Sequence, residues 1–248
     1  MVKNERTLEM RDKTKNENYF KESLSFTTES IYDFEKILPQ VIEKQGADSQ
    51  GVKNGYNALV MYYTKKVNLQ YSLGLPILNI KQDFEKFLRY YATAWEIEYG
   101  YIELIRVLSL SVLLNINKTN SDLELLEKKI KDTCLNDYLI NYLIINIDDN
   151  WELNSKEFYF KGIYEPIRNI IDEKNKTISV EMLKKYLTEQ WYEIHSECAW
   201  YNSHNSKQNT YYGYWAYEAG AISKILKLND EELKEQQYYP YDLVHFQD

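Results

Sequence analysis

Three potential metal ligands lie close together in the last quarter of the chain: His195, Cys198 and His204. Imidazole and thiolate groups are preferred ligands of zinc, and a structural zinc site needs four of them. A fourth ligand is not evident, and Cys198 continues an apolar stripe at helical spacing. We therefore interpret Cys198 as a core residue and His195 as a helix-surface residue, and we predict no metal and no cofactor.

A second candidate is a group of carboxylates, Glu96, Glu98 and Glu103, which crowd one predicted helix. Nucleases that use Mg²⁺ hold the ion with clustered carboxylates. A restriction-type nuclease core would need these acids on adjacent strands with a lysine nearby, and no strand pattern is visible here. A solvated helix face is the simpler interpretation.

The third candidate is Glu218, which the helical spacing of Trp215, Ala219 and Ile222 places on the buried side of a predicted helix. A carboxylate there needs a partner. It is either a catalytic acid with a raised pKa or a structural carboxylate held by Tyr hydroxyls, a Lys or His204. Because no nucleophile or convergent base accompanies it, we favour the structural role.

Short catalytic motifs are absent from the sequence. It contains no GxSxG, P-loop, GxGxxG, HExxH or CxxC pair. Nothing in these residues argues for an enzyme, so we predict no catalytic residues and expect a protein that is not an enzyme.

Helical periodicity predicts the elements that position these residues. The 248 residues include only 8 Gly and 4 Pro, which leaves little material for the tight turns of a many-stranded sandwich or barrel. Apolar residues recur on one helical face from Ile80 to Trp95 and again from Val180 to Cys198. We predict an all-α fold with helices near residues 17–45, 56–73, 80–95, 100–115, 121–130, 137–147, 160–173, 180–198 and 212–228.

Local signals predict some helix ends. Asn79 is expected to cap the helix that follows it, and Ser121 forms a capping box with Glu124. Pro39 is expected to kink or end the first helix because it has no backbone N–H to donate.

The polar stretch 115–121 separates two parts of different charge. Residues 1–120 carry 16 Lys and Arg and 15 Asp and Glu, whereas residues 121–248 carry 14 and 23, so the second part contains all of the acidic excess. We predict a compact multi-helix assembly in which an N-terminal helical domain, residues 1–120, packs on a C-terminal helical domain, residues 121–248.

An acidic C-terminal half disfavours direct nucleic-acid binding, because it repels phosphate, and favours a basic protein partner. Solubility alone is the other explanation of the charge. The acidic loops that we expect to contact a partner contain Asp148, Asp149, Glu152, Asp230, Glu231, Glu232 and Glu235.

Nothing in the sequence predicts export or a membrane span. The N-terminal residues lack the apolar segment of a signal peptide, and the run from Ile102 to Leu114 is short and contains Glu103 and Arg106. Only two cysteines are present, which is typical of a reduced compartment. We expect a cytoplasmic protein without a membrane partner; the oligomeric state is open.

Aromatic residues are concentrated near the C-terminus. Ten of the 24 Tyr and three of the five Trp lie between Tyr186 and Asp248. Tyr can fill a core and still hydrogen-bond a buried group such as Glu218, so we interpret the excess as chiefly structural. A Tyr exposed beside the acidic loops would be the first to test for partner binding.

Four of these aromatic motifs resemble the C-terminal domain of PoNi-type immunity proteins. They are Trp191-Tyr192, the run Trp200 to His204, the run Tyr212 to Ile222, and the run Tyr238 to Leu243. The N-terminal half is similar to that family's N-terminal domain at Tyr71-Ser72-Leu73-Gly74 and along the helix to Trp95. Where family members often carry two aspartates after the third motif, this chain has Asn229 and Asp230.

The resemblance implies an all-helical bacterial cytoplasmic protein that binds and neutralises a cognate PoNe-type DNase toxin delivered between competing cells. The partner would be the toxin's basic DNase domain. We expect the shared motif residues to be structural, namely Tyr71, Ser72, Gly74, Trp191, Trp200, His204, Tyr212, Gly213, Tyr214, Trp215, Glu218, Tyr239, Pro240 and Asp242. The alternatives are a helical enzyme that uses Glu218 and a helical scaffold whose protein partner is not a toxin.

Overall fold

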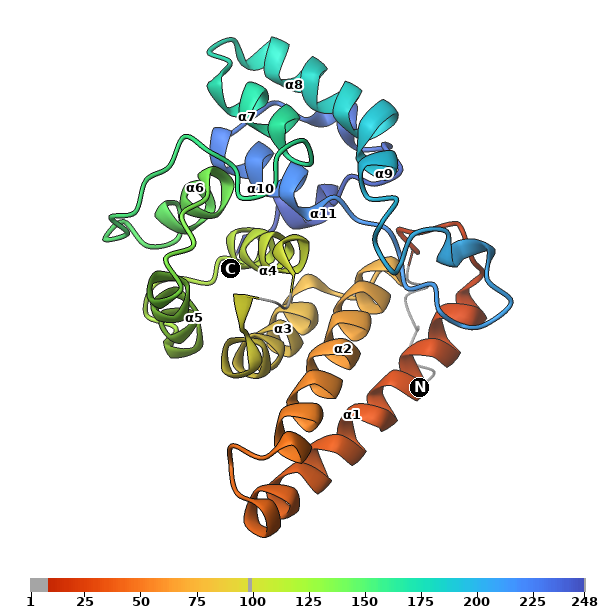
Figure 1. The fold of residues 1–248 in the computed structure, drawn as a ribbon. Helices are drawn as coiled ribbons and strands as arrows, with labels where there is room; N and C mark the ends of the chain where they lie inside the picture. Colours follow the sequence, from red (N-terminus) through yellow and green to blue (C-terminus); the bar gives the residue numbers. More distant parts are fainter. Residues whose placement is uncertain (1–8, 98–99, 248) are drawn as a thin grey trace. The chain divides into compact units, whose positions relative to one another are not determined.

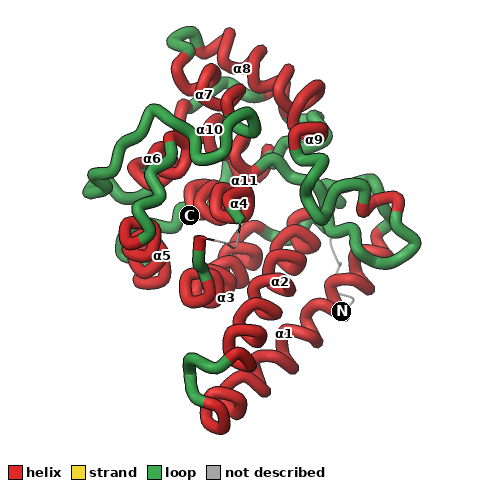
Figure 2. The backbone as a smooth tube through the Cα atoms, in the orientation of Figure 1, coloured by secondary structure: helices red, strands yellow, loops and turns green. Residues whose placement is uncertain are grey.

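The computed structural model describes residues 9–97 and 100–247. In these two stretches helices alternate with loops, and no β-strand is present (Figures 1 and 2). The all-α prediction is therefore confirmed. No helix among the described residues is both long and apolar enough to cross a membrane.

The chain divides into two compact units, and each is formed by two separate stretches. The first unit comprises Met1–Ala94 and Asn202–Tyr214, and the second comprises Trp95–Tyr201 and Trp215–Asp248. These units are defined by contacts in space. The boundary that we expect between residues 120 and 121 divides the sequence into two consecutive domains, and it stays a prediction.

Long helices form most of the first unit, and α2 packs against both α1 and α3 (Figure 1). The side chains of Asn16 and Ser49 begin α1 and α2 by accepting backbone N–H groups of the first turn. The predicted apolar stripe of α3, from Ile80 to Tyr91, is buried. The elements of this unit are α1 (Glu17–Gln45), α2 (Gln50–Ser72), α3 (Ile77–Ala94) and the 3-10 turn η3 (Ser203–Asn205).

Helix α10 lies at the centre of the second unit and contacts α4, α7, α8 and α11. Every residue from Tyr217 to Ser223 is buried, which explains why this helix is apolar on most of its circumference. The α-helices of this unit are α4 (Tyr101–Leu113), α5 (Ser121–Asp132), α6 (Tyr138–Ile145), α7 (Glu165–Asp172), α8 (Lys176–Lys185), α9 (Trp191–Ile194), α10 (Tyr217–Leu226) and α11 (Tyr241–Val244). It also contains the π-helical η2 (Tyr186–Gln190) and the 3-10 turn η4 (Glu231–Leu233).

Helix α1 covers the predicted range 17–45 and does not end at Pro39, because the neighbouring Leu38 is buried and its packing offsets the lost backbone hydrogen bond. Two expected helix starts are wrong. Asn79 lies inside α3, where its N–H donates to the carbonyl of Pro76 at 3.0 Å. Helix α5 is capped by Asn120 rather than Ser121.

The stripe from Val180 to Cys198 is not one continuous helix. Helix α8 passes into the π-helical η2 and then into α9, which ends at Ile194, so Cys198 lies in the following turns. The expected helix at 212–228 also begins late, because residues 211–216 have no regular secondary structure and Gly213 has a positive φ of 106°.

A long connection without helix or strand joins α6 to α7. Helix α7 begins only at Glu165, whereas the sequence predicted a helix from about residue 160. Residues 146–164, hereafter the α6–α7 loop, form the large arc between these helices in Figure 2. Loops of this length inside a compact unit are uncommon and are often functional.

Candidate functional site and partner-binding surfaces

Glu218 is buried in α10 and faces a tyrosine of η2. The Tyr186 hydroxyl donates to Glu218 Oε1 at 2.9 Å. Burial raises the pKa of Glu218 to about 7, and hydrogen bonds from its own backbone and from Tyr186 oppose that rise. Only 5% of the residue is exposed, so a substrate could not reach it easily. A structural role, in which Glu218 joins α10 to η2, fits this burial better than the role of a catalytic acid.

His195 is held as a neutral imidazole in the core of the second unit. Its Nδ1 lies 2.7 Å from the Trp191 carbonyl oxygen, which can only accept, so Nδ1 carries the proton. The Tyr164 hydroxyl can therefore donate to Nε2, 3.3 Å away. Burial lowers the pKa of His195, which favours this neutral form.

The predicted environments of His195 and Cys198 are reversed. His195 is buried and Cys198 is half-buried, because the helix ends at Ile194 and the chain turns before it reaches Cys198. Across residues 9–97 and 100–247, no group of three or more His, Cys, Asp or Glu side chains is placed to hold a metal ion.

Three of the four C-terminal motifs meet in an aromatic stack beside His195. Trp191 stacks on Trp200 with ring centroids 5.6 Å apart, and it contacts Tyr238 at 4.7 Å. Tyr192 stacks on Tyr201 at 4.4 Å. The stack joins residues before and after the segment 202–214, which explains why aromatic residues recur at these positions.

The remaining motif residues from His204 to Tyr214 belong to the first unit. The Tyr214 hydroxyl lies 3.0 Å from His204 Nδ1 and accepts the His204 backbone N–H at 3.1 Å. The Tyr212 carbonyl accepts the Ser72 hydroxyl at 3.3 Å. These bonds close the segment on itself and connect it to the end of α2.

Tyr211 connects the same segment to the residues before α1. Its hydroxyl donates to Asp12 Oδ2 at 2.5 Å. Its backbone N–H donates to the Tyr19 hydroxyl, which in turn donates to the Tyr211 carbonyl, both at 3.0 Å. This residue was not singled out in the sequence, although it directly precedes a recognised motif.

The motif from Tyr71 to Gly74 receives the N-terminal segment of the first unit. The Arg11 and Asp12 N–H groups both donate to the Ser72 carbonyl, and the Arg11 guanidinium lies 4.6 Å above the Tyr71 ring. Gly74 has a φ of 81°, and a Cβ added there would lie 2.1 Å from the Glu9 carbonyl oxygen. Only glycine allows this close approach.

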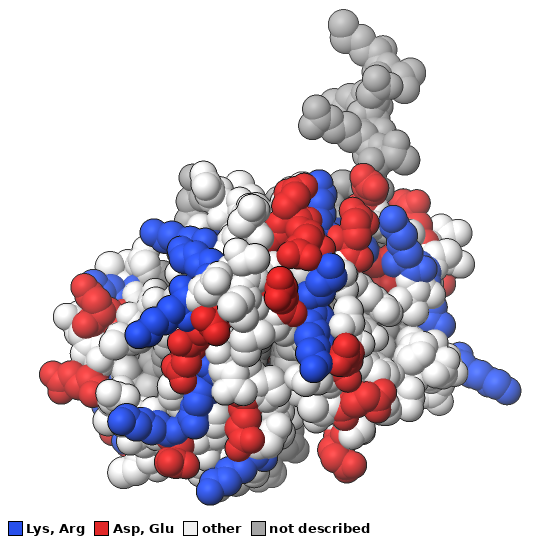
Figure 3. Space-filling model, turned by 90° about the horizontal axis from the view of Figure 1, so that it is seen from above, with Lys and Arg blue, Asp and Glu red and all other residues white. Residues whose placement is uncertain are grey.

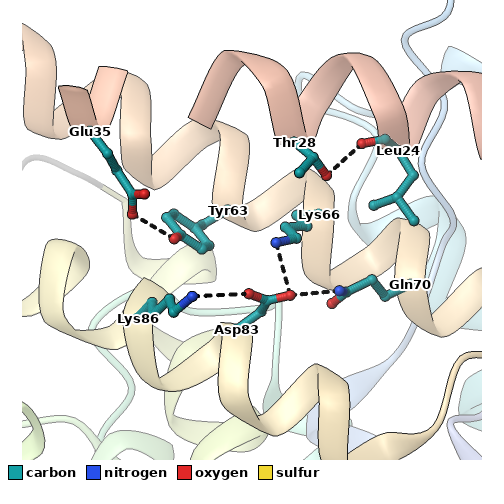
Figure 4. A network of polar contacts seen from close by, with 8 residues as sticks. All are labelled: Leu24, Thr28, Glu35, Tyr63, Lys66, Gln70, Asp83 and Lys86. Carbon is teal, nitrogen blue, oxygen red and sulfur yellow. Dashed lines mark hydrogen bonds and ion pairs between the residues drawn. The ribbon is translucent and has the colours of Figure 1, made fainter. Parts of the chain in front are cut away.

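Two carboxylates that were not singled out in the sequence join the long helices of the first unit, and Figure 4 shows Asp83 with its partners and Glu35 with Tyr63. Asp83 in α3 accepts the Gln70 amide at 2.6 Å and the Lys66 ammonium at 2.9 Å, both from α2. Glu35 in α1 accepts the hydroxyls of Tyr63 at 2.7 Å and Tyr90 at 3.0 Å. In the sequence, these two carboxylates could have been found from their positions beside apolar helix stripes, because a carboxylate at such a position needs a hydrogen-bond donor.

The C-terminal motif encloses Asp230. The sequence predicted this residue in an acidic surface loop, but the structure buries it. Asp230 is 2% exposed and accepts the Tyr239 hydroxyl at 2.6 Å. Its other oxygen lies 2.9 Å from His245 Nε2. The neighbouring Asn229 supplies no carboxylate, and Asp230 alone holds both partners.

Other residues of this motif pack against α10. A Cβ on Gly220 would lie 2.6 Å from Pro240 Cγ, so glycine permits the close contact between α10 and the start of α11. Trp215 is buried immediately before α10, and Asp242 is exposed in the first turn of α11.

The other expected partner contacts lie in two surface segments. In the α6–α7 loop, Asp149 pairs with Lys118 and Glu152 is exposed, while half-buried Asp148 accepts the Asn150 N–H at 2.9 Å. Around η4, the exposed acids are Glu231, Glu232 and Glu235. In the view of Figure 3, basic side chains lie between acidic ones, so the charge on that face is mixed.

The carboxylates considered for a nuclease site do not form one. Glu103 in α4 accepts the Arg106 guanidinium at 2.7 Å, one turn along the same helix. Glu96 is close enough to Lys129 to affect its pKa, and Glu98 lies outside the described residues.

Asp137 positions the α6–α7 loop and was also missed. It is completely buried, and its Oδ1 caps α6 by accepting the N–H groups of Leu139 and Ile140 at 2.9 Å. Its Oδ2 accepts the Tyr101 hydroxyl at 2.9 Å and the Tyr159 N–H at 2.7 Å. One carboxylate thus connects the start of α6, helix α4 and the α6–α7 loop. In the sequence, the feature that could have indicated this role is an Asp at the start of a predicted helix.

These contacts define an all-helical protein whose buried carboxylates join helices by accepting tyrosine hydroxyls. The chain belongs to the PoNe immunity protein (PoNi) family. The N-terminal model of that family matches residues 11–124, and its C-terminal model matches residues 135–243. The resemblance seen in the sequence is confirmed over most of the chain.

The fold is similar to that of a solved structure, the crystal structure of protein PA2201 from Pseudomonas aeruginosa. The two align with a TM-score of 0.65 and 15% identity, covering 95% of this chain and 89% of that chain. At this identity the likeness concerns the fold alone. No curated protein matches the sequence.

Proposed function

We propose that this protein binds and neutralises a cognate PoNe DNase toxin, and so protects the cell that makes it during competition between bacteria. The observation that carries the proposal is the match of both family models, in order, to nearly the whole chain. The protein would act in the cytoplasm, where it would meet the toxin before the toxin meets DNA.

The mechanism we propose is stoichiometric inhibition. An enzyme that cuts DNA needs a basic surface to hold the phosphate backbone. Exposed carboxylates such as Glu152 and Glu235 would attract that surface, and an interface of about 1,600 Å² would block the DNA path or the catalytic centre. This chain would need no chemistry of its own.

The enzyme alternative receives little support from Glu218, because burial and the Tyr186 hydroxyl already account for its position. A scaffold with an unrelated partner would use the same kind of surface. The experiment below separates these alternatives from inhibition.

The test is co-expression of the protein with the toxin encoded beside its gene in a sensitive bacterial strain. We expect survival with intact chromosomal DNA, and a complex of the two proteins that co-purifies. Killing that is unchanged by the protein, together with the absence of a complex, would reject the proposal. Protection by Glu218→Gln equal to that of the wild type would argue against the enzyme alternative.

A further inference from the structure

The α6–α7 loop has a fixed backbone although it contains no helix or strand. The Tyr159 N–H donates to the buried Asp137, and the Tyr138 N–H donates to the Glu157 carbonyl at 2.8 Å. The Arg168 side chain donates to the Lys156 carbonyl. These bonds hold residues 156–159 against α6 and α7.

Two aromatic side chains of the loop point inward and fasten it further. Trp151 is buried, and its indole N–H donates to Asn141 Oδ1 at 3.0 Å. Phe158 is buried between the Tyr138 ring, 5.4 Å away, and the Arg168 guanidinium, 4.6 Å away. The protein thus uses a helix cap, an amide and an arginine to order this loop.

The next two residues point outward. Tyr159 is 52% exposed and Phe160 is 48% exposed. Their rings meet edge to face at 4.9 Å, and both contact the Tyr101 ring, at 6.4 and 5.4 Å. They form one continuous apolar surface on an ordered support, which is the arrangement that binds a partner with little loss of conformational entropy.

The exposed apolar residues of α1 lack this arrangement. Phe26 and Tyr32 of α1 are each 64% exposed, but six residues of helix place them on different faces. Phe26 and Ile37 share a face but lie about 16 Å apart along the axis. None of these side chains makes a continuous patch with another.

The charge of the C-terminal half indicates the partner's chemistry. Within the loop the exposed charges are balanced, because Glu152 and Glu157 stand against Lys156 and Lys161, and Asp149 pairs with Lys118. Residues 121–248, to which the loop belongs, carry 23 Asp and Glu against 14 Lys and Arg. A pair of apolar rings in an acidic half of the chain fits a basic protein surface that carries apolar or aromatic groups.

We propose that Tyr159 and Phe160 are the aromatic anchors through which this protein binds the basic, DNA-binding face of its toxin. This inference rests on the proposed function and adds the surface that performs it. The two rings would be covered in the complex, and the acidic groups of the same loop would meet basic side chains at the rim.

The test is a double variant, Tyr159→Ala with Phe160→Ala, titrated against a catalytically inactivated form of the toxin encoded beside the gene. The matched control is Phe26→Ala with Tyr32→Ala, which removes the same two residue types from a more exposed place. We expect the loop variant to bind roughly 30-fold or more weakly, through faster dissociation, and the control to stay within about twofold of the wild type. Both variants should stay folded, and the loop variant should unfold at a slightly lower temperature than the wild type, because its two half-exposed rings contact Tyr101.

A second measurement separates binding from folding in the unaltered chain. Hydrogen exchange of the amides at residues 157–161 should slow when the toxin is bound. If the wild type binds but these amides exchange at an unchanged rate and both double variants bind alike, the anchor assignment is wrong and the proposed function stands. If the wild type does not bind at all, both proposals are wrong.

Discussion

At the scale of single residues, the tyrosine excess is explained by buried and half-buried carboxylates that need donors. A Tyr hydroxyl supplies a hydrogen bond at the end of a large apolar ring, which Phe cannot do. The pairing recurs in both units and joins residues distant in sequence. The pairs are Tyr211 with Asp12, Tyr63 and Tyr90 with Glu35, Tyr101 with Asp137, Tyr186 with Glu218, and Tyr239 with Asp230.

Replacing Glu218 by Gln should remove part of the pH dependence of folding. Burial raises the pKa of Glu218 from 4.5 to about 7, so the folded chain keeps a proton that the unfolded chain releases above its own pKa. The wild type therefore loses stability as the pH rises from about 4.5 to 7, by on the order of 3 kcal/mol from this group. A neutral Gln avoids that loss while still accepting a hydrogen bond from Tyr186. Denaturant unfolding at several pH values measures the difference.

The control for this prediction is Glu127→Gln. Burial also raises the pKa of Glu127 to about 7, so its replacement should flatten the profile independently. His195 acts in the opposite sense: burial lowers its pKa, and its contribution is lost as the pH falls through 6.5, the unfolded value. Parallel stability curves for the wild type and Glu218→Gln would show that Glu218 is ionised in the folded chain.

At the scale of elements, apolar stripes predicted the existence of most helices but not their ends. The stripe from Val180 to Cys198 continues in the sequence, whereas the helix becomes π-helical at Tyr186 and stops at Ile194. Periodicity reports which residues prefer a common face; it does not report where tertiary packing changes the hydrogen-bond pattern. For the same reason Tyr159 could not be placed on an ordered loop from sequence.

Part of the candidate site was predictable for the opposite reason. A carboxylate on the apolar side of a helix must find a donor, so the sequence predicted that Glu218 meets Tyr hydroxyls, a Lys or His204, and the structure shows the Tyr186 hydroxyl. Asp230 lies in a polar stretch with Glu231 and Glu232, and the stretch resembles a surface loop. Its burial depends on Tyr239 and His245, which follow later in the chain, and local composition does not predict that contact.

Gly74→Ala should destabilise the first unit much more than Gly46→Ala. Both glycines have φ near 80°, which L side chains rarely adopt, so both substitutions incur backbone strain of about 1–3 kcal/mol. At Gly74 the new Cβ would also lie 2.1 Å from the Glu9 carbonyl oxygen, whereas nothing lies within 4 Å at Gly46. Relieving that clash must displace the backbone beside Arg11, and we expect a total loss of about 3 kcal/mol or more. Denaturant unfolding measures both losses, and equal losses would contradict the close approach.

At the scale of the whole molecule, the net charge of −8 favours encounter with a basic partner, and the effect of single loops must be separated from it. The two family models meet between residues 124 and 135, close to the loop where the acidic excess of the sequence begins. This supports, as a proposal, a boundary near residues 120 and 121 for the sequence domains. The acidic part would then be the C-terminal domain, and its exposed loops would guide association.

Reversing Asp149 and Glu152 to Lys should slow association with the toxin most at low salt. Both side chains are exposed, whereas Asp148 supports a turn and is best left in place. The control, Glu22→Lys with Glu43→Lys on α1, changes the net charge by the same amount at two exposed positions. Steering by the loop predicts an association rate about tenfold below that of the control at low ionic strength, with the two rates converging near 0.5 M salt, where the Debye length is only about 4 Å. Stopped-flow measurement across a salt series decides between local and overall charge, because overall charge alone predicts equal slowing of both variants at every salt concentration.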